Sequence, residues 1–181
     1  MKSIKYLDSS RIHHSDFFGS NQVLRLNNGF SFGDLKDFQD TSILNLTNSM
    51  MRLKQIKIRS DSSHIHQIQF VLTDGKQILE LSRHGGQGGV QHEYNVQDGH
   101  RVTKIEIWSK EAVDALRFTT DKGDVSKIFG NTFSLPKFFL RKTPITIKVV
   151  LAPLDGYLIG LKGKNSSIIN MISFIWFIPE R

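Results

Sequence analysis

The chain of 181 residues contains no cysteine, only four prolines and no long uninterrupted apolar run. Without cysteine, neither disulfides nor thiolate metal ligands are available, so side-chain packing has to stabilise the fold. The first 14 residues lack the apolar stretch that a signal peptide or a membrane helix requires. The apolar segment 168–178 is interrupted by Asn170 and Ser173 and is too short to cross a bilayer. We therefore expect a protein that is either cytosolic or already processed, and its compartment stays open.

The balance of charge is basic, with a net charge of +7 and a sequence pI of about 9.7. Such a balance favours anionic partners: sulfated glycans, acidic lipid headgroups or nucleic acid. Charges of both signs are interspersed, so an ordinary solvated surface is the plainer explanation. Nucleic acid is not expected, because the aromatic residues fall at core positions and not among the basic ones. The basic residues that could form an anion-binding face are Lys54, Lys57, Arg59, Lys137, Arg141, Lys142, Lys162 and Lys164.

A threefold internal repeat organises the chain. In each copy, a strand with alternating apolar residues precedes a short polar loop and a second strand that carries a phenylalanine. Ile105 lies 49 residues after Ile56, and Ile159 lies 54 residues after Ile105. Repeats of this period are supersecondary units that share one core. The apolar positions are Ile56, Ile58, Ile65, Ile68 and Phe70, then Ile105, Ile107, Val113, Leu116 and Phe118, then Ile159, Leu161, Ile169, Ile172 and Phe174.

Signals for helices are weak in this sequence. β-branched and aromatic residues are plentiful, and pairs such as Asp74-Gly75 and Asp98-Gly99 are typical of tight turns. Each copy of about 50 residues has room for about four strands of ordinary length. The sequence therefore predicts an all-β protein with three four-stranded antiparallel sheets around a pseudo-threefold axis, which is a β-prism.

Several motifs, in order and spacing, resemble those of jacalin-related lectins. They are His84-Gly-Gly-Gln-Gly-Gly89, Asp98-Gly99, Val102 to Ile107, Leu116 to Thr120, Lys122-Gly123, Phe129 to Thr132, Phe133 to Pro136, Gly156 to Gly163 and Ile168 to Ile172. The resemblance covers about residues 25–178. It implies a β-prism I fold without enzymatic activity, and sugar binding in shallow sites at the ends of the prism. We expect the lectin domain over residues 21–181, an extension of unknown role over residues 1–20, and no cofactor or metal.

The resemblance also implies where sugars bind. In the family, each site pairs a glycine-rich loop of one sheet with the loop between the two repeat strands of another, where an aspartate is expected. Glycines let the backbone approach a sugar closely, and an aspartate accepts two hydroxyl protons in charge-assisted bonds. An asparagine can still accept one proton and donate another, but it carries no charge. The sugar, whether of mannose type or acidic, stays open.

The three candidate sites each depart from the family pattern. The principal site pairs Gly29, in the segment 28–33, with Lys164, Asn165, Ser166 and Asn170, where Asn170 stands in place of the aspartate. The second site pairs Gly85 and Gly86 with Asp61, Ser62, Ser63 and His66, where His66 stands in that place. The third site retains Asp114 but faces it with a single glycine, Gly130.

Other interpretations of these features stay open. The run 85–89 could be a hairpin connection, or the Gly-Gly-Gln loop of a hydrolase. A phosphate loop is not expected, because no Gly-Lys-Ser/Thr follows the run. Asp114 could form a surface ion pair with Lys110 or Arg117. His64 and His66 lie two apart in a strand and so project to one face, a spacing that can hold a metal, but a third ligand is lacking. The prism could bind sulfated polysaccharide or acidic lipid by charge, or serve as a scaffold that has lost sugar binding. A homodimer is expected, since lectins gain strength from multivalency and sheet edges can pair.

Overall fold

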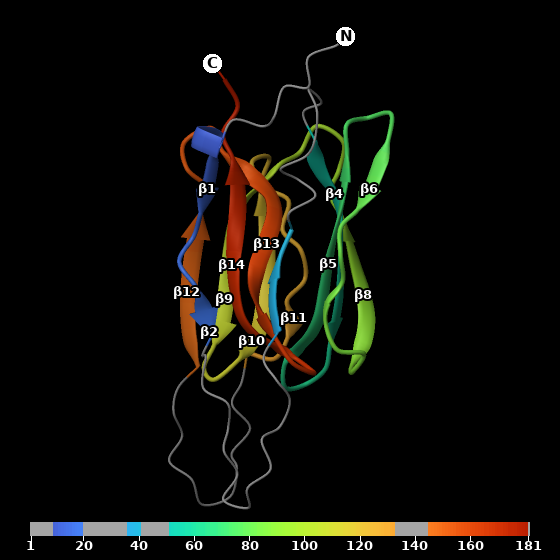
Figure 1. Cartoon of the computed structure of the whole chain (residues 1–181), viewed down its shortest axis with the longest axis vertical. Coiled ribbons are helices and arrows are strands. Elements are labelled where there is room, and N and C mark those ends of the chain that lie inside the picture. The colour runs from blue at the N-terminus through green and yellow to red at the C-terminus, as the bar shows by residue number, and fades with distance from the viewer. Residues whose placement is uncertain (1–8, 20–35, 41–50, 133–144, 181) are drawn as a thin grey trace, which may run out of the picture.

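The computed structural model describes residues 9–19, 36–40, 51–132 and 145–180. Apart from one 3-10 turn, η1 (Ser9–Arg11), the regular elements of this part of the chain are antiparallel β-strands, which confirms the all-β prediction (Figure 1). Within the same residues, no helix is long and apolar enough to span a membrane.

The first repeat forms the centre of one sheet. Strands β4 (Arg52–Ser60) and β5 (Ile65–Thr73) make a hairpin, and β8 (Val90–Asn95) pairs with β4. On the other side of the hairpin, β6 (Ile78–Glu80) and β7 (His84–Gly85) pair one after the other with β5. We call this sheet B.

The other two repeats form sheets of the same plan. In sheet C, β9 (Val102–Ser109) and β10 (Val113–Thr120) make the hairpin, flanked by β12 (Thr146–Leu151) and β11 (Phe129–Gly130). In sheet A, β13 (Tyr157–Asn165) and β14 (Ile169–Phe177) make the hairpin. It is flanked by β3 (Lys36–Gln39) on one side and by β1 (Ile12–His14) and β2 (Phe18–Gly19) on the other. Sheets A and B thus have five strands each, because two short strands share one edge of the sheet, and sheet C has four strands.

The three hairpins pack their inner faces into one core. Every apolar position that the repeat predicted is at most 2% exposed, including Phe70, Phe118 and Phe174. Burying a side chain of this size contributes about 1.5–3 kcal/mol, so the repeat accounts for much of the folding energy. The result is the predicted β-prism, in which the three hairpin loops lie at one end, at the bottom of Figure 1, and the start of β1 and the end of β14 lie at the other.

The described part of the predicted extension, residues 9–19, has a structural role. Strands β1 and β2 complete the edge of sheet A in the place that β6 and β7 take in sheet B. Arg11 holds the start of this segment to the end of β14, because its Nε donates a hydrogen bond of 3.0 Å to the Ile178 carbonyl. Ser15, which lies between β1 and β2, holds this segment to the middle of β14, because the Phe174 amide donates a hydrogen bond of 2.9 Å to its Oγ.

A buried hydrogen-bonded pair joins sheets A and B. Asp40 follows β3, and its Oδ1 lies 2.7 Å from Nε2 of His84 in β7. Its Oδ2 accepts a hydrogen bond of 2.8 Å from the Leu161 amide in β13. Both side chains are almost fully buried, so neither water nor another group can easily replace a lost partner.

Replacing Asp40 with alanine should destabilise the protein by about 3–5 kcal/mol, because His84 and the Leu161 amide would lose a buried partner. Urea denaturation followed by circular dichroism measures this loss. Asp98→Ala is the matched control: Asp98 pairs with Arg52 at 2.9 Å but is exposed, so little change is expected. Equal losses in the two variants would contradict a structural role for the buried pair.

Candidate functional site

Three glycines take equivalent places against the second strand of each hairpin. They have positive φ angles, 97° at Gly19, 106° at Gly85 and 88° at Gly130. A Cβ on any of them would lie 2.0–2.1 Å from a backbone carbonyl oxygen, so only glycine fits there. The ladder partners are Met171 for Gly19, Gln67 for Gly85 and Ala115 for Gly130.

The carbonyl groups that meet these glycines belong to the three positions where a sugar-binding acid was expected. Asn170 meets Gly19, His66 meets Gly85, and Asp114 meets Gly130. Each of these pairs lies within one sheet, so at Gly85 and Gly130 the expectation that the two loops come from different sheets is wrong. The reason is that the short glycine strand pairs directly with the hairpin of its own repeat. The predicted glycine loop 28–33 of the principal site lies outside the described residues.

Gly19 is a described glycine that meets the Asn170 carbonyl. The predicted Gly29 lies outside the described residues, so its place in the site stays a prediction. Sequence reasoning missed Gly19 because the resemblance began near residue 25. A signal was nevertheless present, since Phe18-Gly19 repeats the pair Phe129-Gly130. Both phenylalanines are buried and precede the glycine that meets the hairpin.

The hairpin loop of sheet A presents polar groups at the surface. Ser166 Oγ donates a hydrogen bond of 3.0 Å to Asn170 Oδ1, and the Ser166 amide donates one of 3.0 Å to the Ile168 carbonyl. Asn165 Nδ2 lies 3.5 Å from the Ser166 carbonyl. Asn165, Ser166, Asn170 and Lys164 are all half-buried. Among the described residues, the Nδ2 amide of Asn170 has no hydrogen-bond partner, so it can donate to a ligand.

In sheet B, His66 fills the equivalent space with its own ring. Its Nε2 lies 2.7 Å from Asp61 Oδ2, and its Nδ1 lies 3.4 Å from the Ser167 carbonyl. A Cβ on Gly88 would lie only 2.4 Å from His66 Nδ1, so the ring packs against the glycine run. The side chain is 15% exposed, and little of it is available to a sugar.

The other glycines of this run make room for neighbouring backbone. A Cβ on Gly86 would lie 2.5 Å from the Ser167 carbonyl of sheet A, and one on Gly89 would lie 2.5 Å from the Ser60 carbonyl. The run 85–89 therefore packs closely against two hairpin loops. The glycines of this run are therefore explained by close packing. Neither a hydrolytic loop nor a phosphate loop is needed to account for them.

Asp61 orders the hairpin loop of sheet B. Its Oδ1 accepts hydrogen bonds from the Ser63 hydroxyl at 2.6 Å and from the amides of Ser63 and His64 at 2.7 and 3.0 Å. Partial burial by itself would raise the pKa of Asp61. The hydrogen bonds from the Ser63 hydroxyl, the two amides and His66 outweigh it and hold that pKa well below its usual range.

In sheet C, the retained aspartate is covered. Asp114 Oδ1 lies 2.9 Å from His64 Nδ1, and His64 comes from the hairpin loop of sheet B. Asp114 is buried, and its Oδ2 has no hydrogen-bond partner among the described residues. The alternative in which Asp114 pairs with Lys110 or Arg117 is wrong, because Asp114 faces His64 and Arg117 Nη2 donates to Glu106 at 2.8 Å. His64 and His66 face different carboxylates and do not converge on one point.

Comparison with known proteins decides the family. The model of the jacalin-like lectin domain matches residues 27–175. The chain belongs to this family. Its members are carbohydrate-binding proteins without enzymatic activity, in agreement with the prediction that the chain is not an enzyme. No curated protein sequence matches the chain.

Solved jacalin-related lectins share the fold of this chain. Malaysian banana lectin is 19% identical with a TM-score of 0.62, and the match covers 93% of this chain and 99% of that one. A mannose-binding jacalin-related lectin from Ananas comosus is 18% identical with a TM-score of 0.64, covering 94% and 100%. Artocarpin complexed with methyl-α-mannose is 12% identical with a TM-score of 0.65, covering 93% and 99%. These structures support the β-prism I fold.

The range matched by the family model begins at residue 27, so Gly19 precedes it. The structure nevertheless places β1 and β2 in sheet A, beside the hairpin that carries Asn170. The candidate site of sheet A therefore needs a segment that precedes the matched range.

Gly85→Ala should destabilise the lectin by at least about 1 kcal/mol more than Gly99→Ala. Both glycines have positive φ, but a Cβ on Gly99 meets nothing within 4 Å, whereas one on Gly85 meets the His66 carbonyl. Gly99→Ala should cost only the backbone strain, about 1–2 kcal/mol. Equilibrium urea unfolding of both variants gives the difference, and no difference would refute the close approach.

Stability should fall as the pH drops below about 4, in part through Asp61. A carboxyl whose pKa is depressed in the folded state stabilises the protein above its unfolded pKa, and this stability is lost as the pH falls toward the folded value. Asp61→Asn should be less stable than the wild type at pH 6 and should show a shallower fall. Melting temperatures measured between about pH 2 and 6 test this, and parallel curves would exclude Asp61 as the cause.

Proposed function

We propose that this protein is a lectin that binds neutral, mannose-type glycans at the hairpin loop of sheet A. The residues of the site are Gly19, Lys164, Asn165, Ser166 and Asn170. One observation carries this choice, and it concerns the residues that the structure describes. Of the three equivalent positions, only Asn170 is neither covered by another residue nor held by another side chain at both of its polar atoms. His66 is held by Asp61, and Asp114 is buried beneath His64.

The chemistry of the loop suits a sugar with adjacent hydroxyl groups. Asn170 Nδ2 can donate to one sugar oxygen, while its Oδ1 and the Ser166 hydroxyl can share the proton of another. Because asparagine replaces the charged acceptor and water competes for each bond, we expect modest affinity.

Solved relatives support a mannose-type ligand. The Ananas comosus lectin is described as mannose-binding, and artocarpin has been solved with methyl-α-mannose, mannotriose and mannopentose. The other two positions, with Gly85, Gly86 and His66 in sheet B and Asp114 and Gly130 in sheet C, lack an open polar group of the same kind. In our proposal they support the fold and the neighbouring loops.

Binding of sulfated polysaccharide or acidic lipid by charge is a weaker candidate. Lys57 is paired with Glu80 at 2.8 Å, and Arg59 donates hydrogen bonds to the carbonyls of Gly88 and Gly89. These two residues lie on sheet B, whereas Lys162 and Lys164 lie on sheet A, so they do not form one strand-long stripe. Lys137, Arg141 and Lys142 lie outside the described residues.

Asn170→Ala should weaken binding of mannose oligosaccharides about tenfold, because one to two hydrogen bonds of about 1 kcal/mol are lost. Isothermal titration calorimetry at physiological salt measures the change. Asn95→Ala is the matched control: Asn95 is an exposed asparagine at the far end of β8, and its loss should leave the affinity unchanged.

The same titrations at low and high salt separate the alternatives. A neutral glycan should bind almost equally at both, whereas a sulfated polymer held by charge should be released at high salt. A glycan array without any signal would favour the scaffold function. Mannose binding that survives both Asn170→Ala and Ser166→Ala would show that the site is misplaced.

A further inference from the structure

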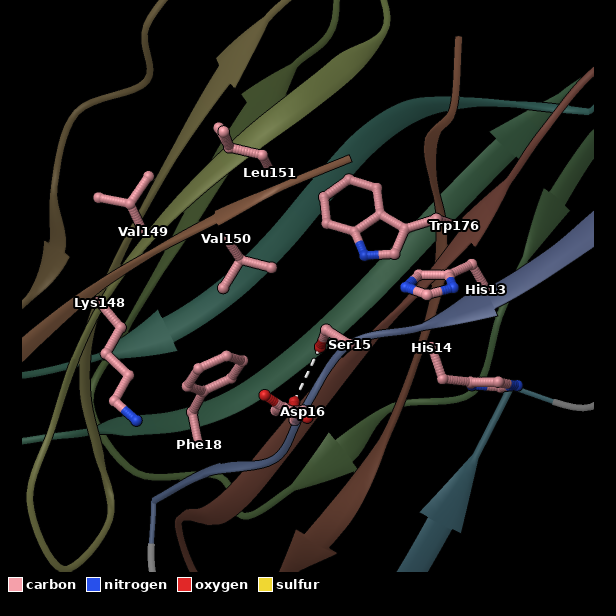
Figure 2. Close-up of a pocket in the computed structure, with 10 residues that line it drawn as sticks. All are labelled: His13, His14, Ser15, Asp16, Phe18, Lys148, Val149, Val150, Leu151 and Trp176. Atoms are coloured by element: carbon pink, nitrogen blue, oxygen red, sulfur yellow. Dashed lines mark hydrogen bonds between the residues drawn. The ribbon is translucent and has the colours of Figure 1, made fainter. Parts of the chain in front are cut away.

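An exposed aromatic side chain lies two residues before Gly19. Phe17 is 47% exposed, and Nζ of Lys162 lies 5.2 Å from the centre of its ring. The next residue, Phe18, is buried, and Figure 2 shows it in the groove between the β1–β2 segment and β12. Lys162 alternates in β13 with Leu161, which belongs to the core, so Lys162 and Phe17 lie on the outer face of sheet A.

Hydrogen bonds fix the backbone that leads to Phe17. The Ser15 amide donates to the Phe174 carbonyl at 3.0 Å, and the Phe174 amide donates to Ser15 Oγ at 2.9 Å. Ser173 Oγ donates to the Ser15 carbonyl at 2.8 Å, and Ser173 is fully buried. The ring is therefore presented on a preorganised backbone, so little conformational entropy is lost when a ligand covers it.

The pseudo-threefold symmetry supplies an internal comparison for this surface. Two residues along the second strand of each hairpin from the glycine row, the hairpin pairs are Ser173–Lys162 in sheet A, Gln69–Lys57 in sheet B and Arg117–Glu106 in sheet C. In sheet B, Lys57 is paired with Glu80 at 2.8 Å. In sheet C, Arg117 Nη2 donates to Glu106 at 2.8 Å. Among the described residues, no carboxylate pairs with Lys162, so sheet A alone leaves the cation of this row to a ligand.

The charges around Phe17 favour an anionic ligand on this face. Asp16 lines the groove on the opposite side of the segment, as Figure 2 shows. Burial lowers the pKa of His14, helped by the charge of Lys162 and by His13, so His14 adds little positive charge at neutral pH. Lys162 thus supplies the positive charge beside the ring.

We propose that Phe17 and Lys162 form a subsite for an anionic sugar residue, one that carries a carboxylate or a sulfate group. This residue is the neighbour, in the same glycan, of the neutral residue at Asn170, so the inference rests on the proposed function. The apolar face of its ring covers Phe17, and its anionic group accepts charge-assisted hydrogen bonds from Lys162. The ligand then takes the place at Lys162 that Glu80 takes at Lys57 in sheet B.

The subsite is continuous with the loop that carries Asn170. Gly19 meets the Asn170 carbonyl, and two residues of chain, no more than about 7 Å, separate Gly19 from Phe17. This separation is comparable with the length of one hexose unit. The row between the two sites ends at Gly19, which faces Met171 and has no side chain to obstruct the path.

Both groups are needed for selectivity. An ion pair with a half-exposed ammonium group is weak by itself, and an aromatic surface by itself accepts neutral sugars as well. Together they favour a sugar that presents an apolar ring face and a negative charge at once. The subsite thus adds a charged neighbour to the mannose-type residue as a determinant of specificity.

Calorimetric titration with matched disaccharides tests the anionic subsite. The probes are glucuronosyl-mannose and 6-sulfated mannobiose, each compared at physiological salt with its uncharged counterpart, glucosyl-mannose or mannobiose. We expect at least one charged probe to bind about fivefold more tightly than its counterpart. The probe that does so distinguishes a carboxylate ligand from a sulfate. No preference for either charged probe would overturn the proposal.

Variants of Lys162 separate this subsite from general attraction by a basic protein. Lys162→Gln should remove the preference and leave the uncharged probes unaffected, whereas Lys162→Arg should retain the preference. Lys57→Gln is the matched control, because Lys57 has the same place in sheet B and is already paired with Glu80. A preference that survives Lys162→Gln, or that Lys57→Gln removes equally, would contradict the assignment.

A variant of Phe17 tests the aromatic part. Phe17→Ala should weaken binding of all four disaccharides about fivefold, with an unchanged circular dichroism spectrum. Binding of methyl-α-mannoside should not change, because a monosaccharide at Asn170 does not reach the ring. Ile128→Ala is the control, since Ile128 is 39% exposed two residues before Gly130 in sheet C and should have no effect. Equal loss of the monosaccharide and the disaccharides would overturn the separate subsite.

Methyl-α-mannoside also distinguishes failure of the subsite from failure of the proposed function. If it binds and the charged probes show no preference, the subsite is wrong and the proposed function stands. If it does not bind but a charged probe binds through Lys162, the Asn170 site is wrong and the anionic site stands. If none of the probes binds, both are wrong.

Discussion

The close approach of a glycine to the second strand of each hairpin determines the geometry of this lectin's loop end. At Gly19, Gly85 and Gly130 the backbone has positive φ and leaves no room for a Cβ beside a carbonyl oxygen. The contact occurs once in each sheet, so the same backbone frame is built three times. Differences between the three candidate sites therefore come from side chains and not from the path of the chain.

Those side chains divide the three positions into different tasks. His66 is drawn into the glycine run by Asp61, and His64 reaches across to Asp114, so two positions are used to hold neighbouring loops together. Of the three positions, only Asn170 has a polar group that is both unburied and without a partner among the described residues. The same departure from symmetry occurs at the sheet edges, where β8 is polar and β12 is apolar. Function in this prism follows from where the repeats differ.

The sequence predicted the core and the fold well because both depend on local periodicity. The alternation of Ile56 and Ile58, and its return at two fixed intervals, specifies strands that must share one core. The equivalence of Asn170, His66 and Asp114 was implied by the resemblance to jacalin-related lectins. Gly19 was missed because the resemblance to the family began only near residue 25. Its partner lies about 150 residues away in sequence, so no periodic signal could replace the resemblance. The cover of His64 over Asp114 also could not be predicted, since it joins side chains of two sheets.

The most direct test of the proposed site is a titration of the ¹⁵N-labelled protein with methyl-α-mannoside, followed by NMR chemical shifts. The proposed site predicts that the amide signals of Gly19, Ser166 and Asn170 shift together and saturably. The signals of the loops around His66 and Asp114 should stay in place. Shifts confined to either of those two loops, or no shift at millimolar sugar, a range typical of weak binding, would contradict it.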